Sequence, residues 1–296
     1  MNFAHLRRPP LLAAAVVALS LAHVQAGDAP GAPATSESRY GLFGLLDRNS
    51  SYGKGLFPEP FLIDDSDLEE GEIRFDWLRT ARGSSHTDNF RVEIEKSLGP
   101  VTLELEVPYE RNVAPGERVD GIANIDLGAR VPVFQWVNQG KTFDTTFGVA
   151  FEWGIPNGSA VSKNGELVPK IFNDTRFGLL TLQTVAGLSF VTGPGEAGGS
   201  RAFEYGFTLG FTIDHKVLPI PGVQQIIPVF ELSGEHGLNK EEEGVDNLTG
   251  LAGVRINLDS IGKIQPRLGV GYVFPLNNIA REDFHSGVYT SLVFEF

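Results

Sequence analysis

The chain has 296 residues, a formal net charge of −13 and no cysteine, so disulfide bonds contribute nothing to its fold. The excess of acidic residues disfavours nucleic acid as a partner, because nucleic-acid binding requires a basic face. The 35 glycines, the 21 phenylalanines and a mean hydropathy of −0.05 favour an all-β protein without long apolar helices.

Residues 1–26 have the pattern of a secretory signal peptide. Arg7 and Arg8 precede an apolar core from Leu11 to Ala22, and Val24-Gln25-Ala26 fits a small-x-small cleavage site. A membrane anchor is the alternative, but the apolar core is shorter than the roughly 20 residues that a spanning helix needs. We therefore expect this segment to be removed during export.

Residues 27–70 are predicted to form a linker followed by a periplasmic or plugging segment. Residues 27–38 are small and rich in proline, as in flexible linkers. Residues 39–70 contain apolar side chains without a clean period. Four interpretations are open for them: a plug inside the β-barrel that the following residues predict, a cap over its periplasmic mouth, a loose periplasmic tail, or a short amphipathic helix at 40–47. The candidate plug residues are Tyr40, Leu42, Phe43, Leu45 and Leu46.

Residues 71–296 alternate between apolar and polar side chains, which is the period of a strand whose two faces meet different surroundings. Phe90–Glu110 contains two such runs around a turn at Gly99-Pro100. Leu167–Gly193 is too long for one strand, so we place a second turn at Phe177-Gly178. The total is then about twelve strands, an even number as in bacterial membrane barrels. They are expected near 72–81, 88–97, 101–111, 121–133, 143–155, 167–176, 179–192, 201–214, 224–235, 246–258, 263–275 and 284–296.

This pattern predicts an all-β fold, a closed antiparallel transmembrane β-barrel over 71–296 with an irregular N-terminal segment. A soluble β-sandwich also alternates, but its strands are usually only about 5 or 6 residues long. Aromatic residues near the strand ends, such as Trp77 and Trp153, would form an interfacial girdle. Short turns on one side and longer polar connections on the other are also typical of outer-membrane barrels.

The chain ends in "GVYTSLVFEF", an alternating strand whose last residue is aromatic. This end resembles the assembly signal of bacterial outer-membrane proteins, in which the last strand is read by the barrel-insertion machinery and then pairs with the first. The matching positions are Tyr289, Leu292, Phe294 and Phe296. The resemblance implies a Gram-negative outer-membrane location, with outer-membrane lipid and the insertion machinery as partners.

A second resemblance covers about residues 60 to 296. "PFLIDDSDLEEGEIRFDW", from Pro60 to Trp77, is similar to the first segment of a family of outer-membrane transporters named for the meta-pathway of phenol degradation. The strand "LELEVPYE" also fits that family. Ser66-Asp67 departs from its pattern, because Ala-Gly often follows the Asp pair there. The resemblance implies a transporter and names no substrate.

Alternation places charged side chains of both signs on the inner face. They either pair across the lumen and fill it, or line a narrow polar path. The candidate lumen-lining residues are Arg91, Glu93, Glu95, Glu104, Glu106, Asp126, Arg130, Glu152, Arg176, Glu204, Glu231, Arg255, Arg267 and His285. No histidine has metal-ligand spacing and cysteine is absent, so neither a metal site nor a cofactor is expected.

The expected function is an outer-membrane channel or transporter for passive passage of a small molecule, with a hydrophobic or aromatic solute as one hypothesis. Two alternatives stay open: a structural or adhesion barrel with a sealed lumen, and a membrane-embedded lipid hydrolase. A hydrolase would need a poised Ser and His. His285 and Ser286 are adjacent and so point to opposite faces of a strand. We therefore expect no enzymatic activity.

Overall fold

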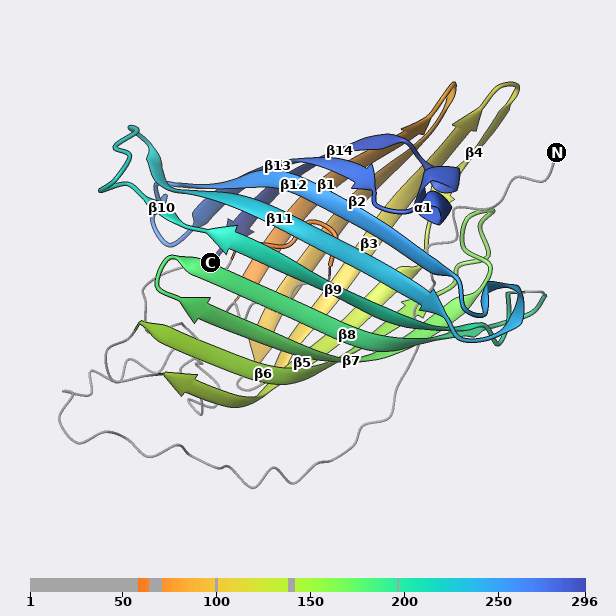
Figure 1. Cartoon of the computed structure of the whole chain (residues 1–296), viewed down its shortest axis with the longest axis horizontal. Helices are drawn as coiled ribbons and strands as arrows, with labels where there is room; N and C mark the ends of the chain where they lie inside the picture. The colour runs from red at the N-terminus through yellow and green to blue at the C-terminus, as the bar shows by residue number, and fades with distance from the viewer. Residues whose placement is uncertain (1–57, 64–70, 99–100, 138–141, 196) are drawn as a thin grey trace.

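The structure is a computed structural model that describes residues 58–63, 71–98, 101–137, 142–195 and 197–296. These residues form a closed antiparallel β-barrel of 12 strands with 2 short extra strands, which confirms the predicted fold class. Figure 1 shows the strands running obliquely around a common interior. No helix in the described part of the chain is long and apolar enough to cross a membrane. The predicted signal peptide and linker lie outside the described residues.

The barrel closes because its first and last strands pair along almost their whole length, from Glu72 opposite Glu295 to Ala81 opposite Ser286. Neighbouring long strands pair in the same antiparallel manner around the rest of the circle. The elements are β1 (Gly71–Arg82), β2 (Ser85–Leu98), β3 (Val101–Ala114), β4 (Glu117–Ile122), β5 (Ile125–Val137), β6 (Phe143–Ile155), β7 (Gly165–Phe177), β8 (Leu180–Thr192), β9 (Arg201–Phe211), β10 (Ile213–Asp214), β11 (Val223–Gly237), η1 (Lys240–Glu242), β12 (Asp246–Leu258), β13 (Gln265–Pro275), α1 (Asn278–Asp283) and β14 (Ser286–Glu295).

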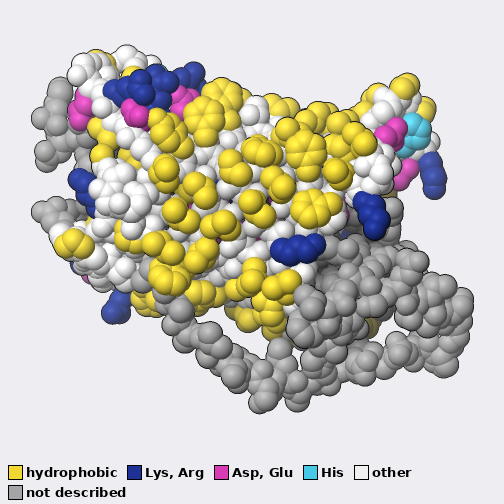
Figure 2. All heavy atoms as spheres, turned by 180° about the vertical axis from the view of Figure 1, so that it is seen from behind, with side chains coloured by type: hydrophobic (Ala, Val, Ile, Leu, Met, Phe, Trp, Pro, Cys, Tyr) yellow, Lys and Arg dark blue, Asp and Glu magenta, His cyan; other side chains and the backbone are white. Residues whose placement is uncertain are grey.

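The two faces of the barrel wall differ as the alternation predicts. Large apolar side chains face outward, including Phe147 at 51% exposure and Tyr272 at 53%, whereas the inward-facing Arg74 is only 1% exposed. Figure 2 shows hydrophobic side chains covering the middle of one side, with most charged side chains toward the two ends. An apolar belt outside and buried charges inside are the arrangement of a barrel that sits in lipid, and the reverse of a soluble sandwich.

The predicted turn at Phe177-Gly178 is present between β7 and β8. Gly178 has a φ of +56°, a left-handed conformation that glycine adopts without strain from a Cβ. Phe177 pairs directly with Leu180, so Gly178 and Leu179 form a two-residue turn between the two strands. The division of this long stretch into two strands is therefore confirmed, and with it the even strand number.

The predicted loop at 112–120 is wrong. β3 continues to Ala114 and returns through β4, which forms a hairpin beyond the barrel (Figure 1). The turn contains Pro115 and Gly116, and Gly116 has a φ of +81°. Proline followed by glycine is a strong turn signal that the interpretation of this stretch as a loop overlooked. The long strand predicted from 121 consequently begins later, at Ile125.

Two further boundaries differ from the prediction. The strand expected at 201–214 divides into β9 and β10 at Thr212, whose backbone N–H donates to the carbonyl oxygen of Leu179. The connection before β14 contains the short helix α1. The Asn277 side chain starts this helix by accepting a hydrogen bond from the backbone N–H of Ala280 at 2.9 Å.

The outward face predicts how a charge there affects stability. Val149 is 45% exposed near the middle of β6, so Val149→Arg is expected to lower the free energy of unfolding in lipid vesicles by about 2–4 kcal/mol. The control is Val217→Arg, because Val217 is 72% exposed between β10 and β11 and should change stability by less than about 0.5 kcal/mol. Equal losses in the two variants would contradict the placement of Val149 in hydrocarbon.

Candidate functional site: a peptide segment held inside the barrel

Residues 58–63 form a short segment without regular secondary structure inside the barrel, just before β1 in the chain (Figure 1). Within it, Glu59 is 0% exposed and Phe61 only 2% exposed. Glycines on the surrounding strands let the segment approach the wall. A Cβ at Gly206 would lie 2.4 Å from Ile63, and a Cβ at Gly269 would lie 2.8 Å from the Phe61 ring. Larger residues at these glycines would therefore displace the segment.

The polar backbone groups of this segment are bound by charged side chains of the barrel wall. The Glu231 carboxylate accepts hydrogen bonds from the backbone N–H of Phe61, at 2.8 and 3.0 Å, and from that of Leu62 at 2.7 Å. Arg255 donates to the carbonyl oxygen of Glu59 at 2.7 Å and to that of Pro60 at 2.6 Å. The wall thus satisfies backbone groups that would otherwise be buried without partners.

The side chains of the segment are held as firmly as its backbone. The Glu59 carboxylate accepts a hydrogen bond from Arg267 at 2.6 Å. The guanidinium carbon of Arg255 lies 3.6 Å from the centre of the Phe61 ring, a close cation–π contact. The Phe61 ring also meets the Tyr289 ring edge-on, with 5.3 Å between centroids. A charged residue and an aromatic residue of the segment are therefore each recognised separately.

Phe61 belongs to a small apolar cluster on the inner wall. The cluster interrupts an interior that is otherwise mainly polar, and it gathers from strands that adjoin in the barrel. Its members are Phe61, Ile227, Val229, Leu251, Val273, Phe284 and Tyr289. The barrel thus offers an apolar surface inside as well as outside, and Phe61 occupies it.

A network of ion pairs crosses the inner wall beside the segment. Arg91 lies 2.5 Å from Asp76 and 2.9 Å from Glu106, and it also donates to the Tyr289 hydroxyl at 3.0 Å. The Tyr289 hydroxyl donates to Asp76 at 2.8 Å. Charges of opposite sign pair across neighbouring strands, so this region is not lined by one sign.

Further pairs extend the network around the wall, where Arg130 contacts Glu95 and Lys170 contacts Glu152. One carboxylate group has the spacing of a metal site: oxygens of Glu93, Glu95 and Glu104 all lie within 4.8 Å of one another. Arg130 also lies 4.0 Å from Glu104. The Arg130 guanidinium therefore compensates the negative charge of these carboxylates in place of a metal ion. We assign the three glutamates to the ion-pair network.

The structure places most of the predicted lumen-lining residues on the inner wall. Arg91, Glu104, Glu106 and Glu204 are partly buried on inward positions of their strands. The buried members of the predicted set are Glu93, Glu95, Asp126, Arg130, Glu152, Arg176, Glu231, Arg255 and Arg267.

His285 does not lie where the alternation puts it. The predicted strand began at 284, but β14 begins at Ser286, and His285 is exposed at the rim. Its backbone N–H donates to the carbonyl oxygen of Ala81, which places the residue at the outer end of the seam between β1 and β14. The side chain is thus outside the regular inward-outward alternation.

Residues of the predicted assembly signal divide between the two faces. Leu292, Phe294 and Phe296 share the outward face, whereas Tyr289 is 4% exposed and points inward to Asp76 and Arg91. The candidate plug residues lie outside the described residues, and they are Tyr40, Leu42, Phe43, Leu45 and Leu46.

The sequence interpretation missed Glu59 and Phe61 as the residues that enter the barrel. A signal was present in β11, where Ile227 and Val229 are inward and apolar while Ile226 and Phe230 make the outward face apolar too. A strand that is apolar on both faces needs an apolar partner inside the barrel. The segment provides that partner.

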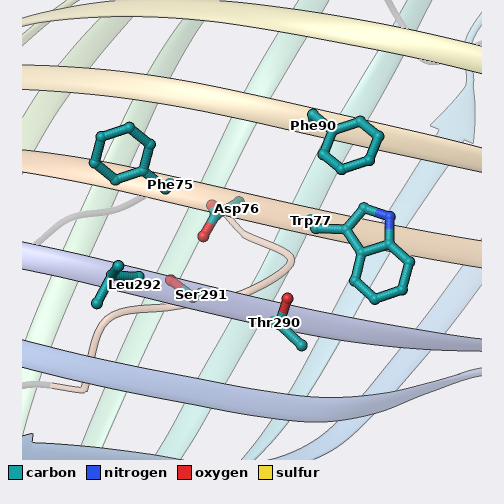
Figure 3. A pocket seen from close by; sticks show the side chains of 7 residues that line it. All are labelled: Phe75, Asp76, Trp77, Phe90, Thr290, Ser291 and Leu292. Carbon is teal, nitrogen blue, oxygen red and sulfur yellow. The ribbon is translucent and has the colours of Figure 1, made fainter.

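A groove lies on the outer side of the same part of the wall. It has a volume of about 320 Å³ and follows the seam between β1 and β14. Figure 3 shows the side chains that line it: Phe75, Asp76, Trp77, Phe90, Thr290, Ser291 and Leu292. Asp76 and Ser291 are only 6% and 5% exposed. The single β-sheet of the barrel wall therefore separates the groove from the segment inside.

Comparison with known proteins supports the architecture. No family model matches the sequence, and no curated protein matches it. An outer membrane channel from Pseudomonas putida F1 is similar in structure, with a TM-score of 0.52 and 13% identity over 79% of this chain and 100% of that chain. At this identity the likeness shows a shared fold, an outer-membrane type of β-barrel.

Two other solved barrels are similar at lower scores. A NanC porin has a TM-score of 0.44 and 8% identity over 76% of this chain and 98% of that chain. LpxR from Salmonella typhimurium has a TM-score of 0.43 and 9% identity over 76% of this chain and 100% of that chain.

The contacts of Glu231 predict a loss of stability when its carboxylate is removed. Glu231→Ala is expected to lower the free energy of unfolding in vesicles by at least about 2 kcal/mol, because each buried amide left without a partner costs about 1–3 kcal/mol. Glu117→Ala is the control, since Glu117 is exposed in the β3–β4 hairpin. The segment should also become sensitive to protease in Glu231→Ala. An unchanged cleavage pattern and unfolding curve would show that Glu231 does not anchor it.

Proposed function

We propose that this protein is an outer-membrane channel for the passive passage of a small molecule, and that residues 58–63 occupy its path. One observation carries the proposal: the side chains of the barrel leave room inside for a peptide segment. Eight-stranded barrels are filled by their own side chains, and barrels of 16 to 18 strands hold open water-filled channels. With 12 strands, this barrel is intermediate, and the segment fills part of its interior.

The way in which the segment is held supports reversible occupancy. Side chains bind its backbone, whereas the barrel strands are joined by continuous ladders of backbone hydrogen bonds. The segment can therefore leave without opening the sheet. Glu231 and Arg255 would remain on the wall, each able to take water as a hydrogen-bond partner in its place.

The surface that Phe61 occupies indicates the class of solute. Apolar side chains of Ile227, Leu251 and Val273, the Tyr289 ring and the Arg255 guanidinium surround or adjoin the Phe61 ring. A small aromatic or hydrophobic molecule would make the same contacts as that ring. This agrees with membership of the transporter family named for the meta-pathway of phenol degradation, which we propose on the resemblance of Pro60–Trp77.

The remaining parts of the proposal concern location and activity. Export by residues 1–26 and insertion through the C-terminal strand would bring the protein to the outer membrane of a Gram-negative cell. We propose no enzymatic role, and hydrolysis of phospholipid by the purified protein would overturn that part. The buried ion pairs around Arg91 and Arg130 favour one alternative, a structural barrel with a sealed lumen.

Conductance in planar bilayers tests the channel against the sealed barrel. Wild-type protein is expected to give rare or small current steps, and Glu231→Ala larger or longer ones, because the segment loses its main amide acceptor. Asp259→Asn is the control, since Asp259 is exposed between β12 and β13, and it should behave as wild type. Silence of both wild type and Glu231→Ala would support the sealed barrel and overturn the channel.

A further inference from the structure

The outer part of the lumen contains a buried carboxylate that the segment 58–63 does not use. Glu166 follows the β6–β7 connection at the start of β7, is 0% exposed, and neither of its carboxylate oxygens has a hydrogen-bond partner. An ionised carboxylate without a partner is costly to bury. Such a group needs either a proton or a positively charged partner.

A second buried polar group faces the same space. The Ser189 hydroxyl is on β8, the strand beside Glu166, with the side chain 1% exposed and without a hydrogen-bond partner. Glu166 pairs with Val191, two residues along β8 from Ser189, so Glu166 and Ser189 are diagonal neighbours on the two strands. A carboxylate and a hydroxyl together offer oxygen acceptors on two strands to one ligand.

Other carboxylates surround this pair. Glu204 and Glu235 are opposite each other in the register of β9 and β11, and both repel the Glu166 carboxylate. Asp126 lies two strands away, with Gly154 between it and Glu166 in register, so no side chain separates the two acids. Lys170 is a nearby cation, and it contacts Glu152. Acidic side chains therefore outnumber cationic ones among these residues.

Acidic groups continue from this site to the outer mouth. Glu235 interacts electrostatically with Glu242 of η1 and with Asp283 of α1. Burial raises the pKa of Asp283, and Glu282 and Glu242 add to the effect, while Asn247 and Arg82 oppose it. A row of carboxylates from the surface inward lowers the electrostatic energy of an entering cation and raises its local concentration.

Hydrogen bonds hold the loop that precedes Glu166. The Ser162 hydroxyl accepts a hydrogen bond from the backbone N–H of Asn157 at 2.9 Å and donates to the Asn124 side chain at 2.5 Å. The Asn124 amide in turn donates to the carbonyl oxygen of Asn164 at 3.0 Å. The site is thus built on a strand end and an ordered loop, which favours a defined ligand position.

We propose that Glu166 and Ser189, with Glu204 and Glu235 around them, form a cation-binding site in the outer lumen. Among the described residues, three carboxylates close enough to bind one metal ion directly, within 4.8 Å of one another, are found around Glu95 and not around Glu166. The site therefore fits a cation that keeps its own hydrogen-bond donors, either a hydrated divalent metal ion or a primary ammonium group. Cation binding at this site does not require conduction through the barrel. A failure of the binding test would therefore leave the channel proposal unaffected, and a silent barrel would leave the site unaffected.

Isothermal titration of the full protein in detergent tests the site at constant ionic strength, with CaCl₂ in one arm and ethylammonium chloride in the other. We expect saturable binding of one of these cations, at least a tenfold weaker affinity in Glu166→Gln, and a smaller loss in Ser189→Ala. The arm that saturates identifies the source of the positive charge. Glu117→Gln, an exposed carboxylate change, should bind as wild type.

A second measurement distinguishes binding from a structural role. Without added cation, Glu166→Gln should unfold at the same or a higher denaturant concentration than wild type, because it removes a buried charge that has no partner. Added cation should stabilise wild type and leave Glu166→Gln unchanged. The proposal is overturned if neither cation saturates, if Glu166→Gln binds as tightly as wild type, or if it is destabilised without cation.

Discussion

A polypeptide in hydrocarbon must pair every backbone polar group, because no water is available to do so. The wall of this barrel meets the requirement by closing β1 onto β14. The segment at 58–63 meets it differently, because it has no strand partner and takes its hydrogen bonds from charged side chains. Glu231 accepts from the N–H groups and Arg255 donates to the carbonyl oxygens. The charged side chains inside the barrel therefore make the backbone hydrogen bonds that a neighbouring strand would otherwise make.

This role explains why arginine is prominent at the inner anchor. A guanidinium offers five donors in a rigid plane, so one side chain can serve several acceptors. Arg74 donates to the carbonyl oxygen of Pro60 at 2.5 Å and also pairs with Asp76 at 2.8 Å. A buried ion pair adds little net stability, because desolvation offsets its Coulomb energy. The contact of Arg74 with the segment is its hydrogen bond to Pro60.

Much of the fold could be predicted from sequence because alternation is a local property. The side chains of one strand report which face meets lipid, and the outward positions of Phe147 and Tyr272 agree with that rule. The segment could not be placed in the same way. Glu59 and Phe61 show no period, and their partners Arg267 and Tyr289 are distant in the chain. Such contacts depend on closure of the whole barrel, which no local pattern encodes.

The boundary errors have two origins. The hairpin through β4 was missed although its Pro-Gly turn is a local signal. The start of β5, by contrast, follows hydrogen bonds between Asn124 and a loop that is distant in the chain. The inward position of Glu166 follows from alternation, but its lack of a partner does not. Whether a charge is paired is decided by neighbouring strands that lie far away in sequence.

The Arg267 guanidinium contacts residues that lie before the first strand and at the end of the last strand. One of its nitrogens binds Glu59, before the first strand, and the other contacts Glu295, at the end of the last. Glu295 is on the strand that pairs with the strand of Arg267, whereas Glu59 precedes β1 in the chain. A single arginine therefore links the peptide ahead of the first strand to the last strand, next to the seam at which the sheet closes.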